Sequence, residues 1–320
     1  MVEDVTKVLD HLKESDSIDR RRETADYINA HQDEFITLLD SGMLSKHKSY
    51  ILDLIDLLSP KVSVSIIERV IGESDTKTRV RGLQAAYRAR IDSLNPRLVD
   101  ILTDTKEEFE IKKWVVHILG STDPKSYGGT LRRIARDSKE NVNLRKEAVF
   151  ALTKAVDEVT LGTLCSLLGD PLAEIRESGA WALSNMSVPE TINCLLAALE
   201  DESENVRDWA IRGLRDMDDT KALQGLADAM SRVSSEEQVR MIRLVVERRS
   251  EIILRAITEL LGSDDVEVLR TAAWAIGVSP YPPAVVALRD LQDHDDDQVR
   301  HYVKIALVRS GGIDPSSLQL

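Results

Sequence analysis

The stretch DPLAEIRESGAWAL, residues 170–183, decides the fold, because residues 201–214 repeat its pattern as DESENVRDWAIRGL. Both segments begin with Asp, carry an aliphatic-Arg pair at the sixth and seventh places, and end on Leu. Both also place Gly or Ala at the tenth and thirteenth places, where a small side chain lets another helix approach closely. The chain is therefore expected to be built from repeated units of two helices.

The aliphatic-basic pair recurs along the chain. It is found at Ile111-Lys112, Leu144-Arg145, Ile175-Arg176, Val206-Arg207, Val239-Arg240, Leu269-Arg270 and Val299-Arg300. Neighbouring pairs lie 30 to 33 residues apart, a period typical of stacked helical repeats. Before residue 106 the register loosens, and Arg79 and Arg81 both remain candidates for the basic anchor.

Each unit predicts a first helix, a tight turn and a second helix. In KENVNLRKEAVFAL, residues 139–152, apolar and small residues follow the i, i+4, i+7, i+8 spacing of one helix face. Aromatic residues make up only 4% of the chain, which favours closely packed helices over sheets. We predict an all-α fold, a right-handed α–α superhelix of about ten helical hairpins. It forms a single array over residues 1–310, least regular in its first two repeats, followed by a flexible tail at 311–320.

The turn inside each unit has its own chemistry. An Asp just before a second helix can accept hydrogen bonds from free backbone N–H groups. A basic side chain six places further on can reach such an Asp, and stacked repeats then form a ladder of ion pairs. We predict that the ladder is structural and consists of Asp170, Arg176, Asp201, Arg207, Asp264 and Arg270.

Charge and cysteine content indicate which partners and which cellular compartment to expect. The net charge of −13 disfavours nucleic acid and anionic membranes, unless the charges are segregated. Cys165 and Cys194 are expected to be two small buried thiols in a reducing compartment. The N-terminus has no signal-peptide pattern, and no apolar run approaches the ~20 residues that span a bilayer. The expected location is cytoplasmic.

The repeated unit D-x4-(V/I/L)-R-x2-(A/G)-x2-(A/G)-L, quoted above from residues 170–183 and 201–214, resembles HEAT repeats. The resemblance is closest to the short prokaryotic HEAT-like repeats first recognised in phycobilisome lyases, and it extends over nearly the whole chain. It implies an α-solenoid whose second helices line a concave surface. It does not imply one task, because such arrays serve many.

Three functional branches of this family can be weighed. The di-iron deoxyhypusine hydroxylases carry His-Glu dipeptides as metal ligands on successive repeats. None of the six histidines is followed by Glu: His11, His31, His47, His117, His294 and His301. We therefore predict no metal site. The bilin lyases share the repeat type, but no further residue pattern demands a chromophore. The HEAT-like DNA glycosylases use a basic concave face, which the acidic net charge disfavours.

The sequence contains no motif that is typical of a catalytic site. The sequence lacks a Gly-rich phosphate loop, a G-x-S-x-G elbow and a metal-binding Cys/His spacing. No catalytic residue and no cofactor are predicted.

Positive charge is concentrated in residues 77–146, which hold 16 Lys and Arg against 9 Asp and Glu. This region is either a solvated face with structural arginines or a basic patch for an acidic segment or a nucleic-acid backbone. The candidate patch consists of Arg81, Arg88, Arg90, Lys112, Lys113, Arg132, Arg133 and Arg136.

All four tryptophans fall on predicted second helices, close to the basic anchor. Trp and Arg are the residue types that most often dominate interfaces, whereas buried Trp can also serve only packing between repeats. The candidate groove residues are Trp114, His117, Trp181, Trp209, Arg212 and Trp274.

The function expected from these observations is a non-catalytic scaffold or adaptor that holds a protein or peptide partner in the concave groove. The alternative is a bilin-lyase-like enzyme or enzyme subunit. The third interpretation is a nucleic-acid backbone binder that acts through the basic 77–146 region.

Overall fold

The computed structural model describes Lys7 and residues 9–10, 17–42 and 45–314, and this part of the chain is helical without a β-strand. It divides into two compact units, Met1–Ala155 and Val156–Leu320, called unit 1 and unit 2 below. Most of the first 16 residues of the expected array and most of the expected tail lie outside the described residues. The single array over 1–310 stays a prediction.

Unit 1 is built of α-helices joined by short turns and 3-10 segments. Its α-helices are α2 Ile18–Ala30, α3 Gln32–Asp40, α4 Lys48–Asp53, α5 Pro60–Ile71, α6 Thr76–Ala89, α7 Asn95–Thr103, α8 Phe109–Thr122, α9 Pro124–Arg136 and α10 Val142–Leu152. The 3-10 segments are η1 Ser45–His47, η2 Ile55–Leu57 and η3 Asp92–Leu94.

Unit 2 continues the alternation of first and second helices. Its α-helices are α11 Glu158–Leu167, α12 Ala173–Met186, α13 Ile192–Ala198, α14 Glu204–Asp216, α15 Thr220–Met230, α16 Ser235–Val245, α17 Glu251–Glu259, α18 Val266–Val278, α19 Val285–Asp290 and α20 Asp297–Arg309. The 3-10 segments are η4 Pro189–Thr191, η5 Leu260–Gly262 and η6 Pro282–Ala284.

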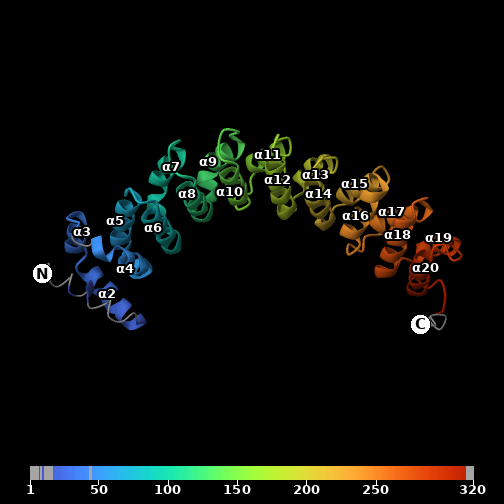
Figure 1. The fold of residues 1–320 in the computed structure, drawn as a ribbon, viewed down its shortest axis with the longest axis horizontal. Coiled ribbons are helices and arrows are strands. Elements are labelled where there is room, and N and C mark those ends of the chain that lie inside the picture. The colour runs from blue at the N-terminus through green and yellow to red at the C-terminus, as the bar shows by residue number, and fades with distance from the viewer. Residues whose placement is uncertain (1–6, 8, 11–16, 43–44, 315–320) are drawn as a thin grey trace. The chain divides into compact units, whose positions relative to one another are not determined.

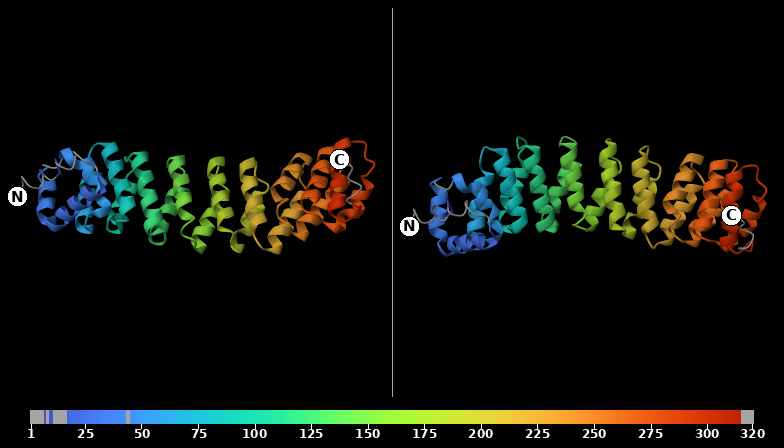
Figure 2. Two further views of the ribbon diagram at one scale, coloured as in Figure 1. Left: turned by 90° about the horizontal axis from the view of Figure 1, so that it is seen from below. Right: turned by 60° about the horizontal axis from the view of Figure 1, so that its bottom comes forward.

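The helices of each unit form two layers (Figures 1 and 2). In unit 2 the odd-numbered helices α11 to α19 form one layer, and the even-numbered helices α12 to α20 form the other. Within a layer, consecutive second helices pack directly on one another, as α12 does on α14 and α18 does on α20. The all-α class and the stacked helical hairpins predicted from the period are confirmed.

Small residues permit this close packing of second helices. A Cβ added to Gly213 of α14 would come within 2.9 Å of the Cα of Ser184 in α12. A Cβ added to Gly120 of α8 would lie 2.5 Å from the Cβ of Ala151 in α10. Real Cβ atoms do not approach this closely, so glycine is a steric requirement at both positions, of which Gly213 occupies the thirteenth place of the repeat pattern.

Arginines near the start of second helices link one repeat to the next. Arg176 of α12 donates to the backbone oxygen of Asp170 and, through Nε, to Oδ2 of Asp201 at 2.8 Å. Arg207 of α14 repeats the first contact, with the oxygen of Asp201, and pairs through Nε with Glu237 at 3.0 Å. The chain thus uses each guanidinium twice, once on its own turn and once on the next repeat.

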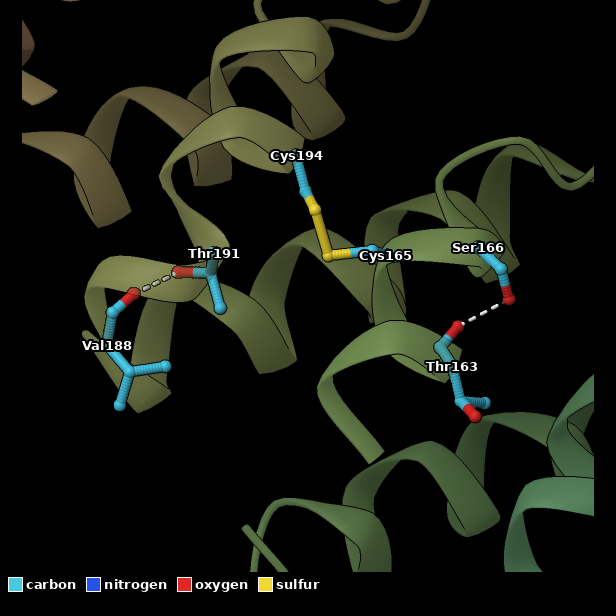
Figure 3. The surroundings of a disulfide bond; sticks show 6 residues. All are labelled: Thr163, Cys165, Ser166, Val188, Thr191 and Cys194. Atoms are coloured by element: carbon cyan, nitrogen blue, oxygen red, sulfur yellow. Dashed lines mark hydrogen bonds between the residues drawn. A yellow bond between two sulfur atoms is a disulfide. The ribbon is translucent and has the colours of Figure 1, made fainter. Parts of the chain in front are cut away.

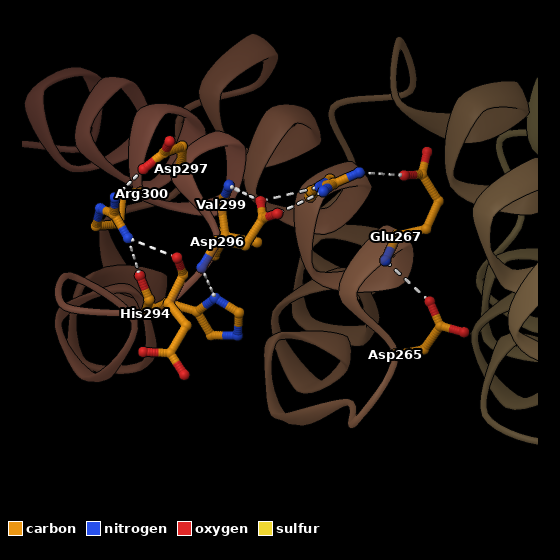
Figure 4. A network of polar contacts seen from close by, with 9 residues as sticks. Asp265, Glu267, His294, Asp296, Asp297, Val299 and Arg300 are labelled. Atoms are coloured by element: carbon orange, nitrogen blue, oxygen red, sulfur yellow. Dashed lines mark hydrogen bonds and ion pairs between the residues drawn. The ribbon is translucent and has the colours of Figure 1, made fainter.

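The same link occurs between α18 and α20 (Figure 4). Asp296 accepts from Nε of Arg270 at 3.0 Å and from the backbone N–H of Val299 at 2.9 Å, so it caps α20 while it binds its neighbour. The N-cap of α18 is Asp265, which accepts from two backbone N–H groups, rather than the expected Asp264, which is exposed. An N-cap must stand directly before the first helical residue, so a displacement of one residue decides which Asp serves.

Two register assignments are settled by hydrogen bonds. In α6 Arg79, and not Arg81, donates to the backbone oxygen of Ile71. In α16 the equivalent bond to the preceding helix comes from Gln238, which donates to the oxygen of Met230. The expected anchor Val239-Arg240 is therefore wrong by two residues, and Arg240 lies on the surface of the second helices.

The expectation of two free thiols was also wrong. Cys165 of α11 and Cys194 of α13 form a disulfide that joins the first helices of consecutive repeats (Figure 3). Both cysteines are half-buried. Because the reducing compartment was inferred from free thiols, the cytoplasmic location loses that support and stays a prediction. In the described part of the chain, no helix combines the length and apolarity needed to cross a membrane.

Candidate interaction surface

One face of the second helices is defined by its register. The residues that begin the buried face, here called the ladder positions, are Arg79, Lys112, Arg145, Arg176, Arg207, Gln238, Leu269 and Arg300. The second and fifth residues after each ladder position, except the buried Thr271, lie outside the core, because buried residues occupy the third, fourth, sixth and seventh places, apart from half-buried residues such as Lys304. We call these side chains the inner face of each unit.

In unit 1 the inner face runs over three neighbouring second helices. Its members are Arg81 and Gln84 on α6, Trp114 and His117 on α8, and Glu147 and Phe150 on α10.

In unit 2 the inner face runs over five second helices. Its members are Ser178 and Trp181 on α12, Trp209 and Arg212 on α14, Arg240 and Arg243 on α16, Trp274 on α18, and Tyr302 and Ile305 on α20.

All four tryptophans belong to the inner face, and none of them is fully buried. Trp114 and Trp209 hold the second place after the ladder position, while Trp181 and Trp274 hold the fifth. Core packing alone does not require an indole that keeps part of its surface in water. The half-buried state of every Trp is the arrangement that an aromatic contact site needs.

Trp209 carries a cation on its ring. The guanidinium carbon of Arg212, one helical turn along α14, lies 5.8 Å from the indole centroid. This distance allows a cation–π interaction, which orients Arg212 across the exposed face of the helix. The pair presents an apolar plane and a positive charge side by side.

Two hollows adjoin Arg243 in unit 2. One, of about 410 Å³, is lined by Trp274 and Tyr302 together with Arg270 and other residues of α18 and α20. The other, of about 400 Å³, lies over α14 and α16 and is lined by Arg207 and Arg240 among others. Because Arg243 lines both, the hollows adjoin along the second helices of this unit.

Unit 1 holds a cluster of rings. Tyr87 of α6 meets Trp114 of α8 edge to face, with 6.3 Å between the centroids, and Trp114 lies 5.7 Å from the ring of His117. His117 reaches the next helix, where its Nε2 lies 3.4 Å from Glu147. On the next second helix, α10, the side chain of Phe150 is 46% exposed.

The candidate basic patch is divided between two layers. Arg81, Arg88 and Lys113 belong to the second helices α6 and α8, and Arg90 follows α6 as its C-cap. Arg132, Arg133 and Arg136 belong to α9, a first helix. The structure does not bring these eight residues together as one surface. A window of 70 residues mixes both layers of a two-layer repeat, so its charge balance does not describe a face.

Lys112 has a separate role. It is buried at a ladder position, and its Nζ lies 3.0 Å from Oε2 of Glu140. It therefore belongs to the links between repeats and not to an accessible patch.

The inner-face or adjoining residues that escaped the sequence interpretation include Arg240, Arg243, Tyr302 and Tyr87. The first pair was hidden by the assignment of Val239-Arg240 as an anchor. The hydrogen-bonding capacity of Gln238 and its spacing from Arg207 were the available signal. Among the described residues, no group of three or more His, Cys, Asp or Glu side chains has an arrangement that could hold a metal ion.

Comparison with known proteins places this geometry in context. A family model described as HEAT repeats matches residues 130–214 and 162–242. Protein YibA of Escherichia coli (strain K12) is 27% identical over 136 residues, which are 42% of this chain and 48% of that protein. The match thus spans about half the length of the curated relative.

Two solved structures align with most of this chain. The Kap95 structure of the Kap95:Nup1 complex aligns with 98% of this chain and 52% of its own, at a TM-score of 0.58 and 12% identity. The complex of CpcE and CpcF of phycocyanin lyase from Nostoc sp. PCC7120 aligns with 78% of this chain and 94% of its own, at a TM-score of 0.38 and 15% identity. At 12% identity the likeness to Kap95 concerns the fold alone.

Proposed function

We propose that this chain, which carries HEAT repeats, is a non-catalytic scaffold or adaptor that holds a segment of another protein against its inner face. A solenoid of such repeats buries a continuous core and leaves one long face of second helices in contact with solvent. That face is consistent with a protein-binding surface.

The observation that carries the proposal is the placement of the tryptophans. Each of the four lies on a second helix, at one of two places in the repeat, and each keeps part of its ring exposed. In unit 2 two of them alternate with Arg212, Arg240 and Arg243 along adjacent helices. Half-exposed Trp beside Arg is the composition that concentrates binding energy at protein interfaces.

The fold supports the same role without naming a partner. Kap95 is described in a complex with Nup1, and another of its structures concerns its binding to RanGDP. We extend only the general role, protein binding by a helical solenoid, to this chain. A cytoplasmic location is part of the proposal.

Affinity capture from native lysate tests the proposal. The wild-type chain, the double variant Trp209→Ala/Trp274→Ala and the control Arg255→Ala would be used as baits, with quantitative identification of retained proteins. Arg255 is on first helix α17, in an exposed pair with Glu251. We expect at least one protein to be retained by wild type and control but lost with the double variant.

An identical set of proteins on all three baits would contradict the proposal. A visible absorbance band in the purified chain would instead support the lyase-like alternative. Retention on DNA or RNA at physiological ionic strength would support the nucleic-acid alternative.

A further inference from the structure

We propose that the inner face of unit 1 binds an acidic protein segment that also carries apolar side chains. The inference rests on the proposed scaffold function and names the chemistry of a partner for one part of the surface. It starts from the charge balance of α6, α8 and α10, which differs from the balance elsewhere in the chain.

The two units have different charges. Unit 1 holds 26 basic and 26 acidic residues, whereas unit 2 holds 16 and 29, so the whole excess of negative charge falls in unit 2. Unit 1 is therefore the part of the chain that an acidic segment approaches without net repulsion.

The positive charges of unit 1 are concentrated around its inner face. Counting the first, second, fifth and ninth residues after each ladder position on α6, α8 and α10, there are five basic side chains and one acidic one. The basic ones are Arg81, Arg88, Lys113, Lys146 and Lys154, and the acidic one is Glu147. The same places on the five second helices of unit 2 hold five basic and four acidic side chains. The basic ones are Arg212, Arg240, Arg243, Arg270 and Arg309, and the acidic ones are Glu177, Asp208, Asp216 and Glu247. Over these places the excess of cations is four in unit 1 and one in unit 2, although the second and fifth places of unit 2 themselves hold Arg212, Arg240 and Arg243.

Lys146 and Lys154 are available to a partner. Both are exposed, and no carboxylate of the described residues is within ion-pair distance of either. Among the other cations of the face, Arg81 contacts Ser49 and Asp53. Arg88 donates to the backbone oxygen of Leu52 at 3.1 Å. Lys113 lies 3.8 Å from Glu110, and Nε of Arg88 lies 3.5 Å from Asp56. Exposed pairs of this kind contribute little and exchange readily with a competing carboxylate.

Three aromatic side chains, here called the apolar strip, lie on the same three helices as these cations. Tyr87 is 41% exposed and Phe150 is 46% exposed, and the ring of Trp114 lies on the helix between them. The three helices pack in sequence, so at 8–10 Å per helix the strip is about 20 Å long, the reach of about six to eight extended residues. The strip explains why the segment needs apolar side chains as well as carboxylates.

Nucleic acid fits this face less well. A phosphate backbone requires a cation excess that is not diluted by acidic surroundings, and unit 1 as a whole is neutral. A peptide can instead place carboxylates on Lys146 and Lys154 and an apolar side chain on Trp114. We therefore commit to a peptide, and an oligonucleotide serves as the competing probe.

Fluorescence anisotropy with the full-length chain tests the proposal. The probes are a labelled synthetic peptide of about eight residues containing Asp, Glu, Leu and Phe, its Asn/Gln counterpart with the same Leu and Phe, and a single-stranded oligodeoxynucleotide of similar charge. We expect the acidic peptide to bind saturably and to weaken with added salt. It should bind at least about tenfold tighter than its uncharged counterpart and tighter than the oligonucleotide.

Variants locate the site. We expect Lys146→Glu and Trp114→Ala each to weaken binding of the acidic peptide by about tenfold or more, since Trp and charged anchors dominate interfaces. The control Arg133→Glu/Arg136→Glu changes two exposed cations of the first helix α9 and should alter the affinity by less than about twofold. Far-ultraviolet circular dichroism melts of each variant exclude loss of fold, and Lys146→Gln provides a milder version of the charge change.

Any of four results would overturn the inference. These are absence of saturable binding by the acidic peptide, equal affinity for the uncharged peptide, tighter binding of the oligonucleotide, and an equal loss of affinity in the α9 control. If lysate capture still depends on Trp209 and Trp274 while the acidic peptide fails, this inference fails and the scaffold function stands. If capture shows no such dependence, the scaffold function itself fails.

Discussion

Arg176 shows what one side chain contributes to the stacking of repeats. Its guanidinium is almost fully buried and binds two carbonyl oxygens of its own turn and the carboxylates of Asp201 and Glu202. Burial raises the pKa of Asp201, but hydrogen bonds from Arg176 and from the N–H of Ser203 outweigh it and hold that pKa below its ordinary value. The charged form of Asp201 is therefore stabilised by Arg176.

We expect Arg176→Leu to lower the free energy of unfolding by about 2–4 kcal/mol, because it leaves Asp201 without its cation and two carbonyl groups without donors. Urea unfolding followed by circular dichroism measures the change. The matched control is Arg255→Ala, which removes an exposed pair and should cost less than about 0.5 kcal/mol. Equal effects of the two substitutions would show that the ladder has no special role.

Asp296 makes stability depend on pH. The Arg270 guanidinium, followed by the N–H of Val299, holds its pKa well below the ordinary value of 3.8. A carboxyl whose pKa is lower in the folded state stabilises the fold above its unfolded pKa, and this contribution disappears as the pH falls towards the folded pKa. We expect wild-type stability to decrease below about pH 4. Asp296→Asn should be less stable at neutral pH and decrease less steeply in acid.

Unfolding by urea at a series of pH values between neutral and strongly acidic checks this. Since Asn does not titrate, the two curves should converge in acid. Curves that stay parallel over the whole range would show that Asp296 is not one of the groups that control acid stability.

At the scale of helices, close packing depends on individual glycines. A Cβ at Gly213 meets the backbone of α12, whereas a Cβ at Gly162 of α11 meets no atom within 4 Å. We expect Gly213→Ala to cost about 1–3 kcal/mol through overpacking. Gly162→Ala should gain up to about 1 kcal/mol through helix propensity. Thermal melts of both variants measure the signs, and the same sign for both would contradict the packing argument.

The disulfide is the covalent link between two first helices. It closes a loop across a sequence separation of 29 residues. By loop-closure entropy, we expect Cys165→Ser/Cys194→Ser to lower stability by about 2–4 kcal/mol. A reductant should destabilise the wild-type chain to a similar extent and leave the double variant unchanged. Urea unfolding with and without reductant, together with a count of free thiols, tests this. A wild-type chain that is insensitive to reductant and has two titratable thiols would disprove the link.

At the scale of the whole molecule, the two units share a repeat but differ in surface chemistry. Both place aromatic side chains on the second helices. The excess of cations around them is larger in unit 1, while unit 2 carries the net negative charge of the chain. A single scaffold with two such faces can select segments of different charge.

The repeat pattern of residues 170–183 was sufficient to predict the helices, their pairing and the small residues between them. Helical periodicity is local: an apolar residue every third or fourth place specifies the buried face whatever the neighbour is. The placement of every Trp on a second helix followed from the same register.

Contacts between repeats were decided only by the tertiary structure. These contacts include the Cys165–Cys194 disulfide, the role of Gln238 in place of Arg240, and the division of the basic region between two layers. Each depends on how far one helix is rotated and shifted against the next, and residues 30 apart in sequence carry no local signal of that geometry. The sequence alone therefore determined the repeat and its buried face, whereas the stacking of the repeats determined which surface side chains stand together.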